Sequence, residues 1–234
     1  MDISDLSYEK LISSEIHKQI GNITFVTATD GNHGRGVAWT ANQLKQKSVV
    51  YMPKGSRLER LKNIQAENAD ASITDLNYDD AVRLANENAK KYGWVVIQDT
   101  SWENYQDIPR WIIQGYSTMA YEAYTQMSQK PTHIFIQAGV GSLAGAITGF
   151  FANAYKEDKP IITVVEPETA NCIFRTAKAN DQKLHFVKGN MPTIMAGLAC
   201  GEPCDIGWNI LKKHADFAIA CADNISAKGM RLLG

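Results

Sequence analysis

Short apolar runs alternate along the chain with amphipathic stretches, and this alternation is the feature that most restricts the fold. The runs are rich in Val, Ile or aromatic residues, and runs of this length and composition are typical of buried β-strands. They lie at residues 24–27, 48–52, 71–74, 94–98, 133–137, 161–165 and 217–221. Strands that alternate with helices predict parallel sheets with helices on both faces, so we expect an α/β protein.

The stretches between the runs predict helices at residues 34–44, 57–66, 78–92, 112–126 and 141–155. A long loop at 99–109 is a plausible crossing between two lobes. We expect an N-terminal helical segment at 1–20, a small α/β domain at 21–110 and a partial large α/β domain at 111–234. The large domain is expected to be incomplete, because the sequence ends soon after a helix start at Ser226.

Charge and cysteine content exclude several classes of site and partner. The 24 Lys and Arg residues against 25 Asp and Glu residues give a formal charge of −1, which provides no basic patch for nucleic acid or an anionic membrane. No apolar run could span a bilayer, and the acidic start is not a signal peptide, so we expect a cytoplasmic protein. Cys200 and Cys204 have no His nearby, so no metal site is expected. We expect Cys172 and Cys200 to be reduced thiols rather than a disulfide.

A glycine-rich sequence, Gly139-Val-Gly-Ser-Leu-Ala-Gly145, follows the predicted strand 133–137 and opens a helix. Such glycines let consecutive backbone N–H groups point at one ligand, and the helix N-terminus adds partial positive charge, which suits a phosphate. Ser142 adds a hydroxyl donor. A tight turn without a ligand stays the alternative. The spacing matches neither a Walker loop nor a dinucleotide fingerprint. A dinucleotide fingerprint also needs an acidic residue that binds the ribose, and Glu166, at the end of the next predicted strand, matches that position only weakly.

A second polar loop, Thr27-Ala-Thr-Asp-Gly-Asn-His-Gly-Arg-Gly36, also follows a predicted strand and opens a helix. Asp30 or Asn32 could simply cap that helix. The loop carries more polar side chains than one cap needs, however, and open α/β sheets bind ligands at the carboxyl ends of their strands. The sequence therefore favours a ligand-binding loop.

Asp99 follows the predicted strand 94–98, so Asp30 and Asp99 end two different strands of what we take as one sheet. Two carboxylates that face each other could divide acid and base roles. The alternative is that Asp99 caps a turn while Trp102 and Tyr105 pack between the lobes.

Together the three loops resemble the fold-type II pyridoxal-phosphate enzymes, the class of the threonine and serine dehydratases and the tryptophan synthase β chain. Within that class the sequence looks most like the diaminopropionate ammonia-lyase family, because Asp30 stands where the dehydratases carry Ser or Thr. The resemblance implies a fold of two parallel-sheet lobes. The stretches that carry it are 28–39, 51–56, 77–84, 98–100, 193–203 and 229–231.

The resemblance implies a pyridoxal 5′-phosphate cofactor and an α,β-elimination that converts 2,3-diaminopropionate to pyruvate and ammonia. It implies a small amino-acid substrate, no metal and a homodimer. Asp30 and Asp99 would be the acid–base pair, and Asn32 would contact the phenolic oxygen of the cofactor. The phosphate would be held by the turn, and Glu166 would lie near the cofactor; the turn residues are Gly139, Val140, Gly141, Ser142, Leu143 and Gly145.

The lysine that bonds the cofactor in this family lies upstream of the Asp30 loop in an Asn-x-Phe-Lys-x-Leu-Gly context. Neither Lys10 nor Lys18 stands in such a context, and the family's C-terminal segment has no counterpart either. We therefore expect a fragment with weak, non-covalent cofactor binding and negligible turnover. A serine or threonine dehydratase-like enzyme and a non-catalytic remnant are the alternatives.

Overall fold

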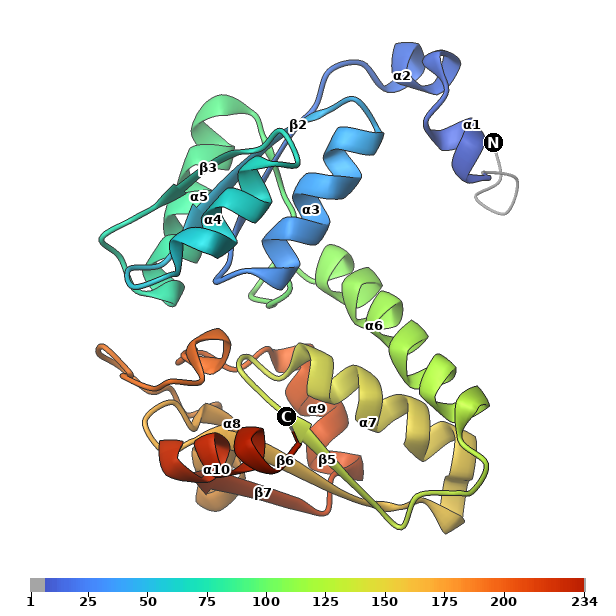
Figure 1. Ribbon diagram of the computed structural model, residues 1–234, viewed down its shortest axis with the longest axis vertical. Helices are drawn as coiled ribbons and strands as arrows, with labels where there is room; N and C mark the ends of the chain where they lie inside the picture. Colours follow the sequence, from blue (N-terminus) through green and yellow to red (C-terminus); the bar gives the residue numbers. More distant parts are fainter. Residues whose placement is uncertain (1–6, 234) are drawn as a thin grey trace. The chain divides into compact units, whose positions relative to one another are not determined.

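A computed structural model describes residues 7–233 of the chain. The chain divides into two compact units, at residues 1–98 and 99–234, and each contains its own parallel sheet (Figure 1). The α/β class with two parallel-sheet lobes is thereby confirmed. The division falls after Gln98, because the long helix α6 (Asp107–Gln126) packs on α7 (Ser142–Tyr155) of the second unit. The domain limits 21–110 and 111–234 stay a prediction.

The first unit is a four-stranded parallel sheet in the order β3-β2-β1-β4, with helices packed on it. The strands are β1 (Thr24–Ala28), β2 (Lys47–Met52), β3 (Asp70–Ile73) and β4 (Val95–Val96). Helices α3 (Asn32–Gln43), α4 (Leu58–Gln65) and α5 (Tyr78–Tyr92) connect them, and α1 (Tyr8–Leu11) and α2 (Ser14–Ile20) precede the sheet. The expected helical segment 1–20 thus holds two short helices, and its first six residues lie outside the described residues.

On the side of β1 that faces β4, a buried side chain rather than strand pairing holds the end of the strand. The predicted strand 94–98 is shorter than expected, since β4 ends at Val96. Gln98 is fully buried, and its side-chain amide accepts from the Ala28 N–H and donates to the Ala28 carbonyl, both at 2.9 Å. Its oxygen also accepts from the Thr27 hydroxyl at 2.9 Å. Gln98 therefore replaces the ladder bonds of a longer strand and fixes the chain just before Asp30.

The second unit is a three-stranded parallel sheet in the order β5-β6-β7. Its strands are β5 (His133–Gln137), β6 (Ile161–Pro167) and β7 (Phe217–Cys221). The buried core joins these strands to helices of the same unit, with Ile147, Ile162, Val164 and Leu211 among its members. Besides α6 and α7 the helices are α8 (Cys172–Ala179), α9 (Asp205–His214) and α10 (Asp223–Leu233), with 3₁₀ turns at Lys156–Asp158 and Ala196–Leu198.

Helices α7 and α9 approach each other through glycines. A Cβ atom added at Gly145 would lie 2.9 Å from Cα of Gly207, and one added at Gly207 would lie 2.6 Å from the carbonyl oxygen of Gly141. These distances are too short for real Cβ contacts, so both positions require glycine. The first turn of α9 therefore packs directly on the backbone that opens α7.

Helix α6 begins earlier than the sequence pattern predicted, at Asp107 instead of 112. Pro109 does not break it, because a proline in the first helical turn lacks only an N–H group that has no helical partner there. The helices α8 and α9 were not predicted, and α10 begins at Asp223 rather than near Ser226.

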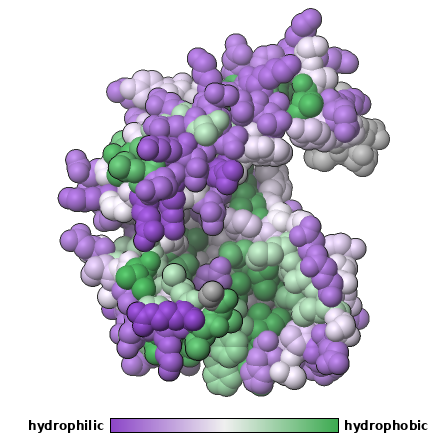
Figure 2. Space-filling view, viewed as in Figure 1, coloured by the Kyte–Doolittle hydropathy of each residue, from purple (hydrophilic) through white to green (hydrophobic). Residues whose placement is uncertain are grey.

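One face of the three-stranded sheet carries exposed apolar side chains. Phe135 on β5 and Phe217 on β7 align with the same residue of β6, Thr163, and they are 66% and 59% exposed. Figure 2 shows apolar side chains gathered over the unit that holds this sheet. Among residues 7–233 no helix combines the length and apolar character needed to cross a membrane.

Candidate active site

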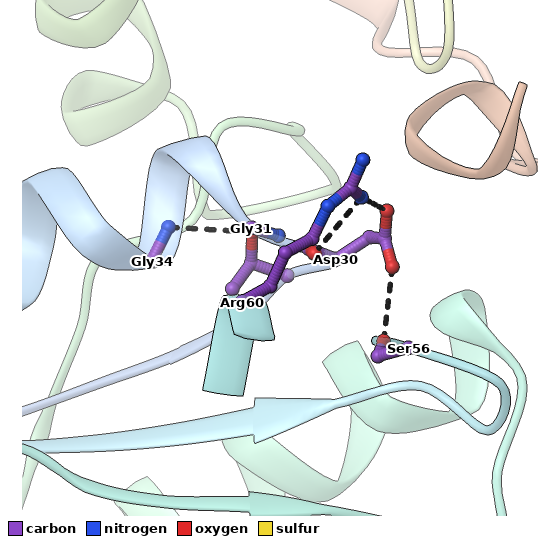
Figure 3. Close-up of polar contacts among 6 residues, drawn as sticks. Asp30, Gly31, Gly34, Ser56 and Arg60 are labelled. Carbon is purple, nitrogen blue, oxygen red and sulfur yellow. Dashed lines mark hydrogen bonds and ion pairs between the residues drawn. The ribbon is translucent and has the colours of Figure 1, made fainter. Parts of the chain in front are cut away.

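Asp30 lies directly after β1 and is held by two donors from the segment that opens α4 (Figure 3). Its Oδ1 accepts a hydrogen bond from the Ser56 hydroxyl at 2.9 Å. Its Oδ2 forms an ion pair with the Arg60 guanidinium, which also donates to the Asp30 carbonyl at 3.3 Å. The side chain of Asp30 is mostly buried, so these contacts fix the direction of its carboxylate.

The cap of α3 differs from both sequence-based candidates. The N-cap residue is Gly31, and neither Asp30 nor Asn32 caps the helix. Instead the Thr29 hydroxyl accepts from the N–H groups of Gly31 at 3.0 Å and Gly34 at 3.3 Å. Asn32 is exposed at the first position of the helix. Its contact with a cofactor stays a prediction.

The glycine turn opens α7 in the way a phosphate site requires. Gly141 is the N-cap, with φ at 95° in the left-handed region that favours glycine, and no side chain caps the helix. The first loop-to-helix bond is that from the Gly145 N–H to the Gly141 carbonyl, at 2.8 Å. The preceding N–H groups of the first turn therefore have no helical acceptor and suit an anion.

The space around the turn is tight. A Cβ atom at Gly139 would lie 3.1 Å from Sγ of Cys200, and one at Gly141 would lie 3.0 Å from Cδ1 of Ile173. A side chain at either position would force its neighbour to shift by a few tenths of an ångström, and at Gly141 the left-handed φ adds strain. With N–H groups that have no helical acceptor, the turn fits the phosphate group that the resemblance implies. None of the four cysteines of the described chain, Cys200 included, is in a disulfide bond.

Asp99 is joined to this turn through Ser142. The buried Ser142 hydroxyl donates a hydrogen bond to the Asp99 carbonyl oxygen. The Asp99 carboxylate in turn accepts from the Tyr116 hydroxyl of α6 at 3.2 Å. The structure thus brings Ser142, on the glycine turn, into contact with Asp99, which follows β4; the sequence predicts both as site residues. Whether Asp30 and Asp99 act as a pair stays a prediction.

Glu166 is engaged within its own unit. Its carboxylate is fully buried and accepts from the N–H groups of Ile173 at 2.9 Å and Phe174 at 2.6 Å, in the first turn of α8. Burial raises the pKa of Glu166 to about 7, although these two N–H groups and the Cys172 side chain favour the charged form. Glu166 therefore holds the start of α8, whose Ile173 lies against Gly141; its place near a cofactor stays a prediction.

Four residues that shape the site were missed by the sequence reasoning: Ser56, Arg60, Tyr116 and Gly207. Arg60 is thirty positions from Asp30, and a single basic residue on an amphipathic helix normally indicates a solvent-exposed face. Tyr116 lies inside a predicted helix with several other aromatic residues. No local pattern marks any of the four. In the described part of the chain, no group of three or more His, Cys, Asp or Glu side chains is placed to hold a metal ion.

Comparison with known proteins gives one family model, described as pyridoxal-phosphate dependent enzyme, which matches residues 5–234. The diaminopropionate ammonia-lyase of Salmonella typhimurium is 53% identical over 99% of this chain, and that of Escherichia coli K12 is 49% identical over 100%. The chain spans 58% of the length of each of these curated relatives.

Solved structures show the same relationship. The holo diaminopropionate ammonia lyase from Escherichia coli superimposes with a TM-score of 0.91 and 48% identity, over 100% of this chain and 58% of that one. The processed form of threonine deaminase isoform 2 from Solanum lycopersicum matches with a TM-score of 0.70 at 21% identity, over 94% of this chain and 57% of that one. The second match shows a shared fold only. The family model covers nearly the whole sequence, so the chain belongs to the family of pyridoxal-phosphate dependent enzymes.

Proposed function

We propose that this protein is a pyridoxal-phosphate-dependent ammonia-lyase that converts 2,3-diaminopropionate and water to pyruvate and two molecules of ammonia. The observation that carries the proposal is the 53% identity to a diaminopropionate ammonia-lyase over 99% of the chain, an alignment that spans both aspartates and the glycine turn. Relatives named as threonine dehydratases are more distant, at 28% identity over 63% of the chain.

In this proposal the glycine turn holds the cofactor by its phosphate. The N–H groups of Gly141, Ser142 and Leu143 would bind the phosphate oxygens, with the α7 N-terminus adding partial positive charge. Asn32, exposed at the start of α3, would contact the phenolic oxygen. When bound, pyridoxal phosphate withdraws electrons from the α-carbon of an amino acid and so makes its proton removable.

The two aspartates would handle the protons. One carboxylate removes the proton from the α-carbon, and the amino group on the β-carbon leaves readily only when it carries an extra proton. A carboxylate beside that group stabilises its ammonium form through a charge-assisted hydrogen bond. Asp30, fixed by Ser56 and Arg60, and Asp99, tied to the phosphate turn through Ser142, are suited to these tasks.

The test begins with the DNA that flanks the reading frame, in which an Asn-x-Phe-Lys-x-Leu-Gly sequence is sought. The protein at its full length is then incubated with pyridoxal phosphate and with 2,3-diaminopropionate, serine or threonine. We expect pyruvate from the diamine with a kcat/KM at least about tenfold above that for serine. Faster consumption of serine or threonine would instead identify a dehydratase, and no product from any of the three would favour a non-catalytic remnant.

The proposal also includes a homodimer in the cytoplasm. Four cysteines in the thiol form suit a reducing compartment. Light scattering coupled to size-exclusion chromatography of the full-length protein tests the dimer, and a mass of one subunit at micromolar concentration would refute it.

A further inference from the structure

The ion pair between Arg60 and Asp30 brings a cation to a carboxylate that is proposed to bind the substrate's ammonium group. Figure 3 shows the guanidinium at one carboxylate oxygen and the Ser56 hydroxyl at the other. The Asp30 side chain is 11% exposed, whereas that of Arg60 is 43% exposed. Asp30 is therefore the buried member of the ion pair, with a fixed carboxylate direction, and Arg60 is the member that extends from the surface.

The local sequence leaves room for this contact. A Cβ atom at Gly31 would lie 3.2 Å from Cδ of Arg60, so the stem of the arginine passes over a residue that has no side chain. The φ of Gly31, 169°, is extended backbone that any residue adopts, so a larger residue here would affect the space of the arginine stem, which would have to shift by a few tenths of an ångström, rather than the backbone conformation. Arg60 lies in the first turn of α4, and Ser56 lies just before that helix. One segment thus supplies both donors.

The two donors leave the carboxylate able to accept more. Each carboxylate oxygen has two lone pairs, and Ser56 and Arg60 approach different oxygens. A further donor can therefore bind Asp30 while both contacts persist. A guanidinium that is fixed on one side of a carboxylate restricts its rotamers, which is the condition for placing a substrate group to within a fraction of an ångström.

We propose that Arg60 is a positioning residue, which holds Asp30 in the orientation that receives the β-ammonium group of the substrate. The inference rests on the proposed function and goes beyond it, since it assigns the preference for a diamine over a hydroxy amino acid to an arginine as well as to the aspartate. Arg60 acts through Asp30 and makes no contact with the reacting atoms in this scheme.

The kinetic test compares Arg60→Met, Arg60→Lys and the matched control Arg57→Met in the full-length enzyme. Arg57 is an exposed arginine at the start of the same helix. We expect Arg60→Met to lower kcat/KM for 2,3-diaminopropionate by about tenfold or more and to change that for serine by less than about twofold. Lysine should restore much of the activity, and Arg57→Met should leave it unchanged. Tighter binding of the diamine by Arg60→Met would overturn the proposal, because Arg60 would then compete with the substrate.

A second measurement needs neither cofactor nor turnover. Urea unfolding of the full chain as wild type, Arg60→Met, Asp30→Asn and the double variant forms a double-mutant cycle. If the two residues interact, the double variant should lose less stability than the sum of the two single losses. We therefore expect its urea midpoint to lie above the midpoint calculated by adding the two single shifts. Additive effects would overturn the Arg60 proposal and leave the proposed function standing. Full turnover of the diamine by Asp30→Asn would instead overturn the proposed role of Asp30.

Discussion

The hydroxyl of Tyr116 donates a hydrogen bond to a carboxylate oxygen of Asp99, and the two oxygens lie 3.2 Å apart. Burial, the nearby Asp99 charge and this hydrogen bond all raise the pKa of Tyr116, so the phenol stays protonated and remains a donor at neutral pH. The Asp99 carbonyl is tied to Ser142 in the same unit, so main chain and side chain of this aspartate are both held.

Tyr116→Phe should therefore impair catalysis without unfolding the protein. Removal of this hydroxyl takes one hydrogen bond from the Asp99 carboxylate, and we expect kcat for 2,3-diaminopropionate to fall by roughly tenfold in the full-length enzyme. Tyr121→Phe, at an exposed position of the same helix, is the control and should have no effect. An unchanged kcat for Tyr116→Phe would show that Asp99 does not depend on this hydrogen bond.

Glu166 should make stability depend on pH. Its pKa in the folded state, about 7, lies above the ordinary value of 4.5, so the folded protein holds a proton that the unfolded chain releases between these two values. The stabilisation from this proton is complete below about pH 4.5 and is lost as the pH rises through about 7. Measured against Glu166→Gln, the free energy of unfolding of the wild type should therefore fall between about pH 5 and about pH 8. A difference that does not change with pH would contradict the assignment.

Gly207→Ala should disturb the phosphate turn from the α9 side. The added methyl group would meet the Gly141 carbonyl, so we expect a loss of roughly 1–3 kcal/mol in the free energy of unfolding, together with weaker binding of pyridoxal phosphate. Gly115→Ala on α6 is the matched control, because nothing lies within 4 Å of its Cβ position. There alanine should stabilise the protein by about 0.5–1 kcal/mol. Equal effects of the two substitutions in chemical denaturation would disprove the steric argument.

Asp30→Ser should shift the substrate preference. The substitution removes the carboxylate that is proposed to pair with the β-ammonium group, and it supplies the hydroxyl that the dehydratases carry at this position. We expect the ratio of kcat/KM for serine to that for 2,3-diaminopropionate to rise by about tenfold or more in the full-length enzyme. An unchanged ratio would remove Asp30 from the choice of substrate.

Much of the fold could be predicted from the sequence, because each buried strand is a local apolar run. The strands at 133–137 and 217–221 have the predicted bounds, and the helix at 78–92 does as well. The glycine turn was also found, since glycines between a strand and a helix are a local signal. The sequence pattern predicts the start of α6 too late. The predicted loop 99–109 includes Pro109, whereas in the structure this proline lies in the first turn of the helix.

The supports of the two aspartates could not be predicted in the same way. Arg60 reaches Asp30, and Tyr116 reaches Asp99, only because the fold places distant segments side by side. Nothing in the local sequence distinguishes Gly207 from the other glycines, yet it packs on the Gly141 carbonyl. Such contacts depend on tertiary packing, for which a single sequence carries no periodic or local mark.

The exposed apolar face of the three-stranded sheet will lower the solubility of the 234-residue chain. Parallel strands normally have both faces covered, yet here two phenylalanine rings on flanking strands meet water. Concentrated samples of the 234-residue chain should therefore associate through this face, and their turbidity should rise with protein concentration and with kosmotropic salt. Replacing Phe135, which is 66% exposed, with a lysine should lower this turbidity for the 234-residue chain.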